Sequence, residues 1–149
     1  MRTDADVDLA AVFERAPGLV ARLRVARDAS PQAVVAAARE ALAAMSERER
    51  IAVLDAHPRI GADPASLSLL SRREQGATAD AATLRELAEL NDAYERKFGF
   101  RFVVFVAGRP NGEIVSILRE RLANPREDEL HTGINEFLAI SLDRLERAR

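Results

Sequence analysis

Apolar residues recur at helical spacing along most of this chain, and short stop signals separate one run from the next. The run nearest the C-terminus spans residues 127–147 and contains Leu130, Ile134, Phe137, Leu138, Ser141, Leu142 and Leu145. Residues three and four positions apart lie on the same face of a helix. The spacing therefore predicts a long closing helix that buries one face against the rest of the molecule.

Capping residues indicate where the other helices begin. Ser30 precedes a proline, which is the arrangement of an N-cap followed by proline in the first turn. Ser46 and Glu49 have the spacing of a capping box, and Thr83 and Glu86 repeat it. The expected helices occupy residues 9–15, 19–26, 31–45, 47–56, 83–98, 114–122 and 127–147, with a further helix start at 71–74.

Residues 100–107 are apolar apart from Arg101 and rich in valine and phenylalanine. Their propensity is that of a buried strand. A lone strand cannot satisfy its backbone hydrogen bonds, however, and no other segment offers a partner. We therefore expect a buried helix or an extended linker here, and favour the helix. The prediction for residues 1–149 is one compact, all-α, multi-helix domain.

The composition is that of an ordinary globular domain. The chain has 149 residues, 48% hydrophobic and 31% charged, with a formal net charge of −2. Without a positive surplus, nucleic-acid binding by phosphate neutralisation is not expected. The absence of cysteine excludes disulfides, zinc–thiolate sites and a thiol nucleophile. The polar N-terminus and the lack of a membrane-length apolar run lead us to expect a cytoplasmic protein with no membrane partner.

Two histidines, His57 and His131, are available for proton transfer near neutral pH. His57 directly precedes Pro58, and a residue before proline disfavours helical backbone. We therefore expect His57 at a helix end or in the loop beyond it. His131 lies in a helix that packing already explains, and we interpret it as a surface or half-buried residue. Residue patterns alone leave His57 open to a structural or a catalytic role.

Glu74 and Arg109 are further candidates, each with a structural alternative. Ser71 and Glu74 have capping-box spacing, so the carboxylate could simply accept the Ser71 backbone N–H. Arg109 lies in a Gly-Arg-Pro turn. Its guanidinium could bind a substrate carboxylate through two N–H groups, or the side chain could simply be exposed on the turn. The sequence has no Gly-rich phosphate loop, no metal-ligand spacing and no Gly-x-Ser-x-Gly elbow. An enzyme of this kind would use acid–base and electrostatic catalysis without a cofactor or metal.

Three blocks occur in a recognisable order. They are His57-Pro58-Arg59-Ile60-Gly61, then Ser71-Arg72-Arg73-Glu74-Gln75, then the run from Leu90 to Val104, which reads LNDAYERKFGFRFVV. In this order they resemble the 2-oxo-4-hydroxy-4-carboxy-5-ureidoimidazoline (OHCU) decarboxylases, over nearly the whole chain. The resemblance implies an all-helical, cofactor-free enzyme that commonly forms homodimers. It also implies conversion of OHCU, a product of hydroxyisourate hydrolysis, to S-allantoin with loss of CO2 in urate breakdown.

The resemblance also implies roles for individual residues. It gives two catalytic residues, His57 and Glu74, and four that bind the substrate or shape its pocket: Pro58, Ser71, Gln75 and Arg109. Loss of CO2 leaves an electron pair on a ring carbon, which an adjacent carbonyl or imine delocalises before a proton is delivered. We hypothesise that His57 transfers this proton, that Glu74 raises the pKa of His57, and that Arg109 offsets the substrate's negative charge.

The chain departs from the family pattern at several positions, one of which is Ile60, where many members have leucine. Arg59 stands where many members have aspartate, and Arg101 where many have proline. Some members carry the substrate-binding arginine about two residues before the position of Arg109, where this chain has Ala107. If Arg59 enters the pocket, its charge lowers the pKa of His57. Two alternatives stay open: a non-catalytic helical module that binds a small molecule or a partner, and a decarboxylase acting on another ureido or imidazole acid.

Overall fold

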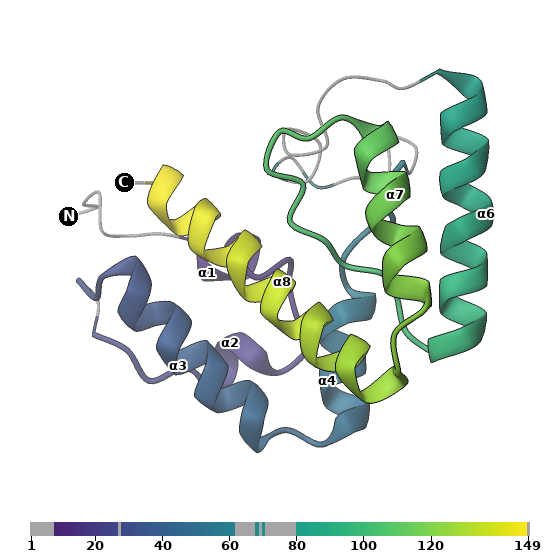
Figure 1. Ribbon diagram of the computed structural model, residues 1–149. Helices are drawn as coiled ribbons and strands as arrows, with labels where there is room; N and C mark the ends of the chain where they lie inside the picture. Colours follow the sequence, from purple (N-terminus) through teal and green to yellow (C-terminus); the bar gives the residue numbers. More distant parts are fainter. Residues whose placement is uncertain (1–7, 27, 62–67, 69, 71–79, 149) are drawn as a thin grey trace.

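Helix α8 (Arg126–Arg147) runs through the middle of the molecule, with the N-terminal helices on one side and the pair α6 and α7 on the other (Figure 1). The computed structural model describes residues 8–26, 28–61, 68, 70 and 80–148. Within these residues the backbone is helical or irregular, without a strand, which confirms the all-helical class. The remaining described helices are α1 (Leu9–Val12), α2 (Leu19–Arg22), α3 (Pro31–Ala44), α4 (Glu47–Asp55), α6 (Ala81–Phe98) and α7 (Asn111–Leu122).

The predicted caps of α3 and α4 are confirmed. The Ser30 hydroxyl accepts the backbone N–H of Ala33 at 3.1 Å. In the capping box of α4, Ser46 Oγ accepts the Glu49 N–H at 3.2 Å, and the Glu49 carboxylate accepts the Ser46 N–H at 2.9 Å. Each bond satisfies a backbone donor that the first turn of a helix leaves without an intrahelical partner. These short-range contacts place α4, and therefore the residues that follow it.

The start of α6 differs from the prediction. Asp80 is the N-cap, and its side chain accepts the Thr83 N–H at 2.8 Å, so that Thr83 is the third residue of the helix. The predicted Thr83–Glu86 capping box is therefore wrong. An aspartate N-cap satisfies the same donor, and the periodic apolar stripe begins only one turn later. The end of the helix is as predicted, because Gly99 adopts a left-handed φ of 80°.

Two N-terminal helices are shorter than their apolar spacing predicts. The first ends at Val12, because Glu14 and Arg15 both adopt left-handed backbone with φ of 51° and 54°. The second ends at Arg22, and Leu23 is already extended. Left-handed backbone is unfavourable for residues with a side chain, so the surrounding structure must hold the turn at Glu14 and Arg15.

Residues 101–106 belong to neither a helix nor a strand and run as an extended connection between α6 and α7 (Figure 1), which corrects the favoured helix. Phe102, Val103, Val104 and Val106 are buried together with Phe100, whereas Arg101 and Phe105 are partly exposed, so the segment threads the core between α6 and α8. Side chains supply the hydrogen bonds that a neighbouring strand would otherwise provide. Three of these bonds come from other helices: Arg101 N–H to Asp55 Oδ1 (2.9 Å), Phe105 N–H to Glu136 Oε1 (3.1 Å), and Arg121 Nη1 to the Val103 carbonyl (2.7 Å).

A buried polar network joins α6, α7, α8 and this extended segment. Arg121 Nε donates to Glu129 Oε1 at 2.8 Å, and the Tyr94 hydroxyl donates to the same carboxylate at 2.5 Å. The guanidinium also lies over the Phe102 ring, 4.6 Å from its centroid. Asn124 Nδ2 donates to the other oxygen, Glu129 Oε2, at 2.8 Å. Since the carboxylate is fully buried and accepts three hydrogen bonds, the network specifies how these four elements pack.

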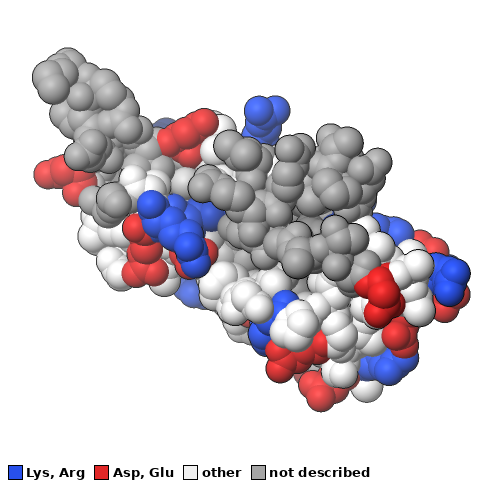
Figure 2. Space-filling view, turned by 90° about the horizontal axis from the view of Figure 1, so that it is seen from above, with Lys and Arg blue, Asp and Glu red and all other residues white. Residues whose placement is uncertain are grey.

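The surface carries both signs of charge. Seen from above, acidic and basic side chains are interspersed over the described part of this face (Figure 2). None of the described helices combines the length and the apolar character that a membrane crossing requires.

Candidate functional site

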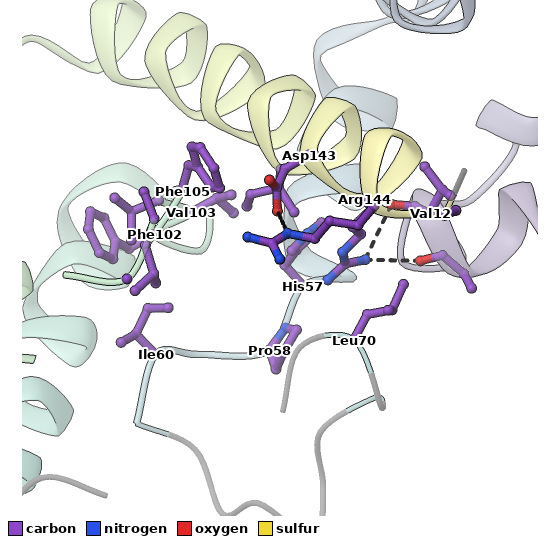
Figure 3. Close-up of a pocket in the computed structure, with 18 of the residues that line it drawn as sticks. Val12, His57, Pro58, Ile60, Leu70, Phe102, Val103, Phe105, Asp143 and Arg144 are labelled. Atoms are coloured by element: carbon purple, nitrogen blue, oxygen red, sulfur yellow. Dashed lines mark hydrogen bonds and ion pairs between the residues drawn. The ribbon is translucent and has the colours of Figure 1, made fainter. Parts of the chain in front are cut away.

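A cavity of about 420 Å³ lies between the end of α4, the extended segment and the C-terminal half of α8 (Figure 3). Its described wall is mainly apolar, with side chains from Val12, Ile60, Leu70, Phe102, Val103, Val104, Phe105, Val106 and Ile140. The ionisable residues in the wall are Asp8, His57, Asp143, Arg144 and Arg147. A small apolar cavity with a few converging polar groups is the usual form of a small-molecule site.

His57 lies just beyond α4, as predicted, and its ring is buried with 5% exposure. The ring meets Phe137 edge-on, with 5.2 Å between centroids and 81° between planes. Within the described part of the chain, neither ring nitrogen has a hydrogen-bond partner. Buried polar atoms are normally hydrogen-bonded, so two such nitrogens in a cavity wall point to a ligand that supplies the missing bonds.

Burial lowers the pKa of His57 to about 4, assisted by the positive charges of Arg144 and Arg101 and opposed by Glu14. This shift of the His57 pKa is opposite in direction to the expected one, and the contribution expected from Glu74 lies outside the described residues. The imidazole is neutral at neutral pH, with one nitrogen able to accept a proton and the other able to donate a hydrogen bond. An anionic ligand beside the ring would raise the pKa again.

Arg144 is a cavity residue that sequence reasoning missed. It has 3% exposure, and its Nη1 donates to the carbonyls of Ala11 (2.9 Å) and Val12 (3.2 Å). The sequence did contain a signal. Arg144 falls on the predicted apolar stripe of the closing helix, three residues after Ser141, and a charged residue on a buried stripe is rare unless it is paired or functional.

Glu14 supplies the ion-pair partner of Arg144. The distance from Arg144 Nη2 to Glu14 Oε1 is 3.0 Å, and the Ser68 hydroxyl donates to the same oxygen at 3.1 Å. The left-handed turn at Glu14 thus directs a carboxylate toward the cavity wall. Strained backbone of this kind is concentrated at functional sites.

The other predicted site residues are placed as follows. Pro58 lines the cavity beside His57. Arg109 donates through Nε to the Val106 carbonyl (3.0 Å) and through Nη2 to the Phe105 carbonyl, so its side chain closes its own turn. From that turn the cavity wall includes Ala107 and Gly108. Three predicted residues lie outside the described part of the chain: Ser71, Glu74 and Gln75.

Arg59 is not among the residues of the cavity wall. Its guanidinium pairs with Asp92 and Glu95 of α6, both at 2.8 Å. The described residues contain no group of three or more histidine, cysteine, aspartate or glutamate side chains that could hold a metal ion. What the described site offers chemically is a neutral, desolvated imidazole beside a guanidinium. This pair suits proton transfer on a small anion.

Comparison with known proteins assigns the chain to a family. Residues 1–146 match the OHCU decarboxylase family. The chain is 36% identical over 94 residues to the uric acid degradation bifunctional protein TTL of Arabidopsis thaliana, covering 58% of this chain and 29% of that protein. It is 30% identical over 105 residues to the 2-oxo-4-hydroxy-4-carboxy-5-ureidoimidazoline decarboxylase of Halalkalicoccus jeotgali, covering 68% of this chain and 59% of that protein. The chain thus spans less than two thirds of either relative.

The fold is similar to that of a solved structure as well. A crystal structure of an OHCU decarboxylase in the presence of (S)-allantoin superposes with a TM-score of 0.76 at 27% sequence identity. The match covers 98% of this chain and 97% of the solved one. The match over residues 1–146, together with the shared fold, shows that the chain belongs to the OHCU decarboxylase family.

Proposed function

We propose that this protein converts OHCU to S-allantoin and CO2 in urate breakdown, without a cofactor. One observation carries the proposal: a buried imidazole, without hydrogen-bond partners in the described structure, shares a small cavity with the guanidinium of Arg144. The choice of substrate is supported by family membership and by the likeness to a decarboxylase crystallised in the presence of (S)-allantoin.

The reaction requires few catalytic groups. The bond between the carboxylate and the hydroxyl-bearing ring carbon breaks, and CO2 leaves while the electron pair stays and passes into the adjacent C=N bond. The hydroxyl proton is lost as the carbonyl forms, a proton is added to the ureido-bearing carbon, and the nitrogen takes one proton from solvent. A neutral His57, with its lowered pKa, would accept the hydroxyl proton and return it to carbon.

Arg144 would offset the negative charge of the substrate and of the nitrogen that receives the electron pair. A fixed guanidinium in a desolvated cavity stabilises such charge more strongly than water does. The family resemblance adds Glu74 as a second catalytic residue and Pro58, Ser71, Gln75 and Arg109 as substrate contacts; these roles remain proposals.

The experiment is an assay of freshly generated OHCU, followed by circular dichroism of the allantoin formed. We expect a rate well above the spontaneous background and an S-allantoin signal with the parent protein. His57→Ala should remove both while helicity is retained. Activity of His57→Ala within a few-fold of the parent would rule out the role of His57.

A non-catalytic binding module is the alternative. It would bind allantoin or OHCU in the same cavity without accelerating loss of CO2. A parent protein that leaves the background rate unchanged, but shows saturable binding of allantoin by calorimetry, would support this alternative and exclude the decarboxylase.

The family resemblance further supports a homodimer, and we propose a cytoplasmic location for the reaction. Light scattering coupled to size-exclusion chromatography would test the first proposal, and fractionation of the native cells would test the second.

A further inference from the structure

Arg101 connects the two walls of the cavity. It stands at the start of the extended segment, and its Nη1 donates to the backbone carbonyls of His57 (2.8 Å) and Asp55 (3.1 Å). Its own backbone N–H donates to Asp55 Oδ1 at 2.9 Å. Three hydrogen bonds therefore tie the end of α4, including the His57 peptide, to the segment that forms the facing wall.

The position of these carbonyls explains why a cation suits this place. α4 ends at Asp55, and the last carbonyls of a helix lack intrahelical partners and carry partial negative charge. A guanidinium can donate to two of them at once because its N–H groups form a rigid, planar fork. An ammonium group at the same position would keep the charge but lose this geometry.

One acidic residue of α6, Glu95, lies beside Arg101. Glu95 Oε2 lies 3.7 Å from Arg101 Nε and 2.8 Å from Arg59 Nε. Arg59 also pairs with Asp92. Arg59 and Arg101 thus share the carboxylate of Glu95 on α6. This sharing fixes the His57 loop against α6 from outside the cavity.

We propose that Arg101 is a positioning residue for His57, which holds the His57 peptide against the extended segment and thereby sets where the imidazole sits in the cavity. The inference rests on the proposed function, since it concerns the residue that would transfer the proton. Arg101 donates to the His57 backbone carbonyl and not to the ring nitrogens, so it acts through His57. Glu95 supports Arg101 and Arg59 as their common anchor.

Charge provides a second readout of the same contact. Burial, Arg144 and Arg101 lower the pKa of His57, and Glu14 raises it. The other charged groups in the described cavity wall are Asp8, Asp143 and Arg147. Replacing Arg101 by a neutral residue removes one of the positive charges, so the pKa of His57 should rise.

The experiment compares Arg101→Gln and Arg101→Lys with Arg126→Gln as the matched control. Arg126 makes the same kinds of contact elsewhere: its Nε donates to the Phe98 carbonyl at the end of α6 (3.0 Å), and its Nη1 pairs with Glu47 (3.1 Å). The measurements are kcat and KM on OHCU, the melting temperature, and NMR titration of the imidazoles. His131 is the internal reference, because the chain has two histidines.

For Arg101→Gln we expect kcat to fall about 10- to 100-fold, with a smaller change in KM and an upward shift in the pKa of His57. Arg101→Lys should keep the pKa near the parent value and recover only part of kcat. Arg126→Gln should change the melting temperature but leave kcat, KM and the pKa of His57 at their parent values. If Arg101→Gln does not fold, Glu95→Gln replaces it and should lower kcat in the same direction.

The proposal is overturned if kcat and the His57 titration of Arg101→Gln both match the parent. It is also overturned if Arg126→Gln loses kcat to the same extent, because the effect would then follow stability. A parent protein inactive on OHCU would sink the proposed function instead. The NMR titration and a structure of Arg101→Gln would then still show whether the imidazole moves.

Discussion

Arg144 of α8 and Glu14 of the turn after α1 form a buried ion pair, with 3.0 Å between Nη2 and Oε1 across 130 residues of sequence. Of the two, Arg144 lines the cavity whose wall also contains His57. Because Arg144 also donates to two carbonyls at the end of α1, it joins the N-terminal turn to the closing helix. Arg144 therefore both supplies positive charge to the site and holds the N-terminal turn against α8.

The ion pair leads to a prediction about which arginine serves the substrate. Arg144→Gln should lower kcat/KM on OHCU about 100-fold or more, because it removes fixed positive charge from a desolvated site. Arg109→Gln should lower it only a few-fold, because the Arg109 side chain is engaged with the carbonyls of its own turn. Steady-state kinetics of both variants makes the comparison.

Stability must be separated from catalysis in that test. Breaking a buried ion pair on one side costs about 3–5 kcal/mol, because the other charge stays buried without its partner. The double variant Arg144→Gln with Glu14→Gln removes both charges and should regain part of the melting temperature without regaining activity. Equal losses of kcat/KM in the Arg109 and Arg144 variants would contradict the assignment.

A second prediction concerns the free energy of unfolding, which the buried imidazole of His57 lowers. Its two ring nitrogens are buried without partners in the described structure. Replacing such a group by an apolar residue of similar size is neutral or stabilising. His57→Met should therefore raise the free energy of unfolding, by about 1 kcal/mol, while abolishing S-allantoin formation.

Urea denaturation of the parent and of His57→Met measures the difference. Phe137→Leu is a useful control, because it removes the ring that contacts His57 and should lower stability, as core substitutions usually do. A clear loss of stability in His57→Met would contradict this prediction, because it would mean that the buried imidazole contributes favourable interactions to the fold.

The lowered pKa of His57 predicts the direction of the pH dependence. The pKa is about 4 in the folded protein against a usual value of 6.5, so the unfolded chain binds a proton that the folded chain does not. Stability is thus full above pH ~6.5 and falls as the pH drops toward ~4. Between pH 7 and 5 the loss should be about 2 kcal/mol.

Chemical denaturation at several pH values checks this, with His57→Met as the reference. The variant lacks the group, so the difference between the two proteins isolates the contribution of His57. If both proteins lose stability in parallel from pH 7 to 5, the imidazole is not held neutral by the fold.

The buried network around Glu129 carries a fourth prediction. Glu129→Gln keeps the shape of the side chain but leaves Arg121 charged and without its counter-ion. The loss in unfolding free energy should be about 3–5 kcal/mol. Glu47→Gln breaks the exposed pair with Arg126 and should cost less than about 1 kcal/mol. Thermal or urea melts compare the two, and similar losses would mean that the buried network contributes little.

Local interactions made much of the architecture predictable. Ser30 and Ser46 accept hydrogen bonds from residues three positions away, so both helix starts could be found from adjacent residues alone. The position of His57 followed from Pro58 in the same way. The face of α8 followed from periodicity, because a helix repeats its geometry along the chain.

Tertiary contacts decided the rest. Residues 101–106 are extended because side chains from α4, α7 and α8 form hydrogen bonds with their backbone groups. No local sequence pattern predicts these partners. Arg144 became a site residue only when the fold brought Glu14 beside it from 130 residues away, whereas Arg109 is held by carbonyls three and four residues before it. Sequence by itself determined where most helices begin and which faces they bury, since those depend on neighbours a few residues apart. The structure alone decided which charged groups meet in the cavity, since burial and pairing depend on segments far apart in the chain.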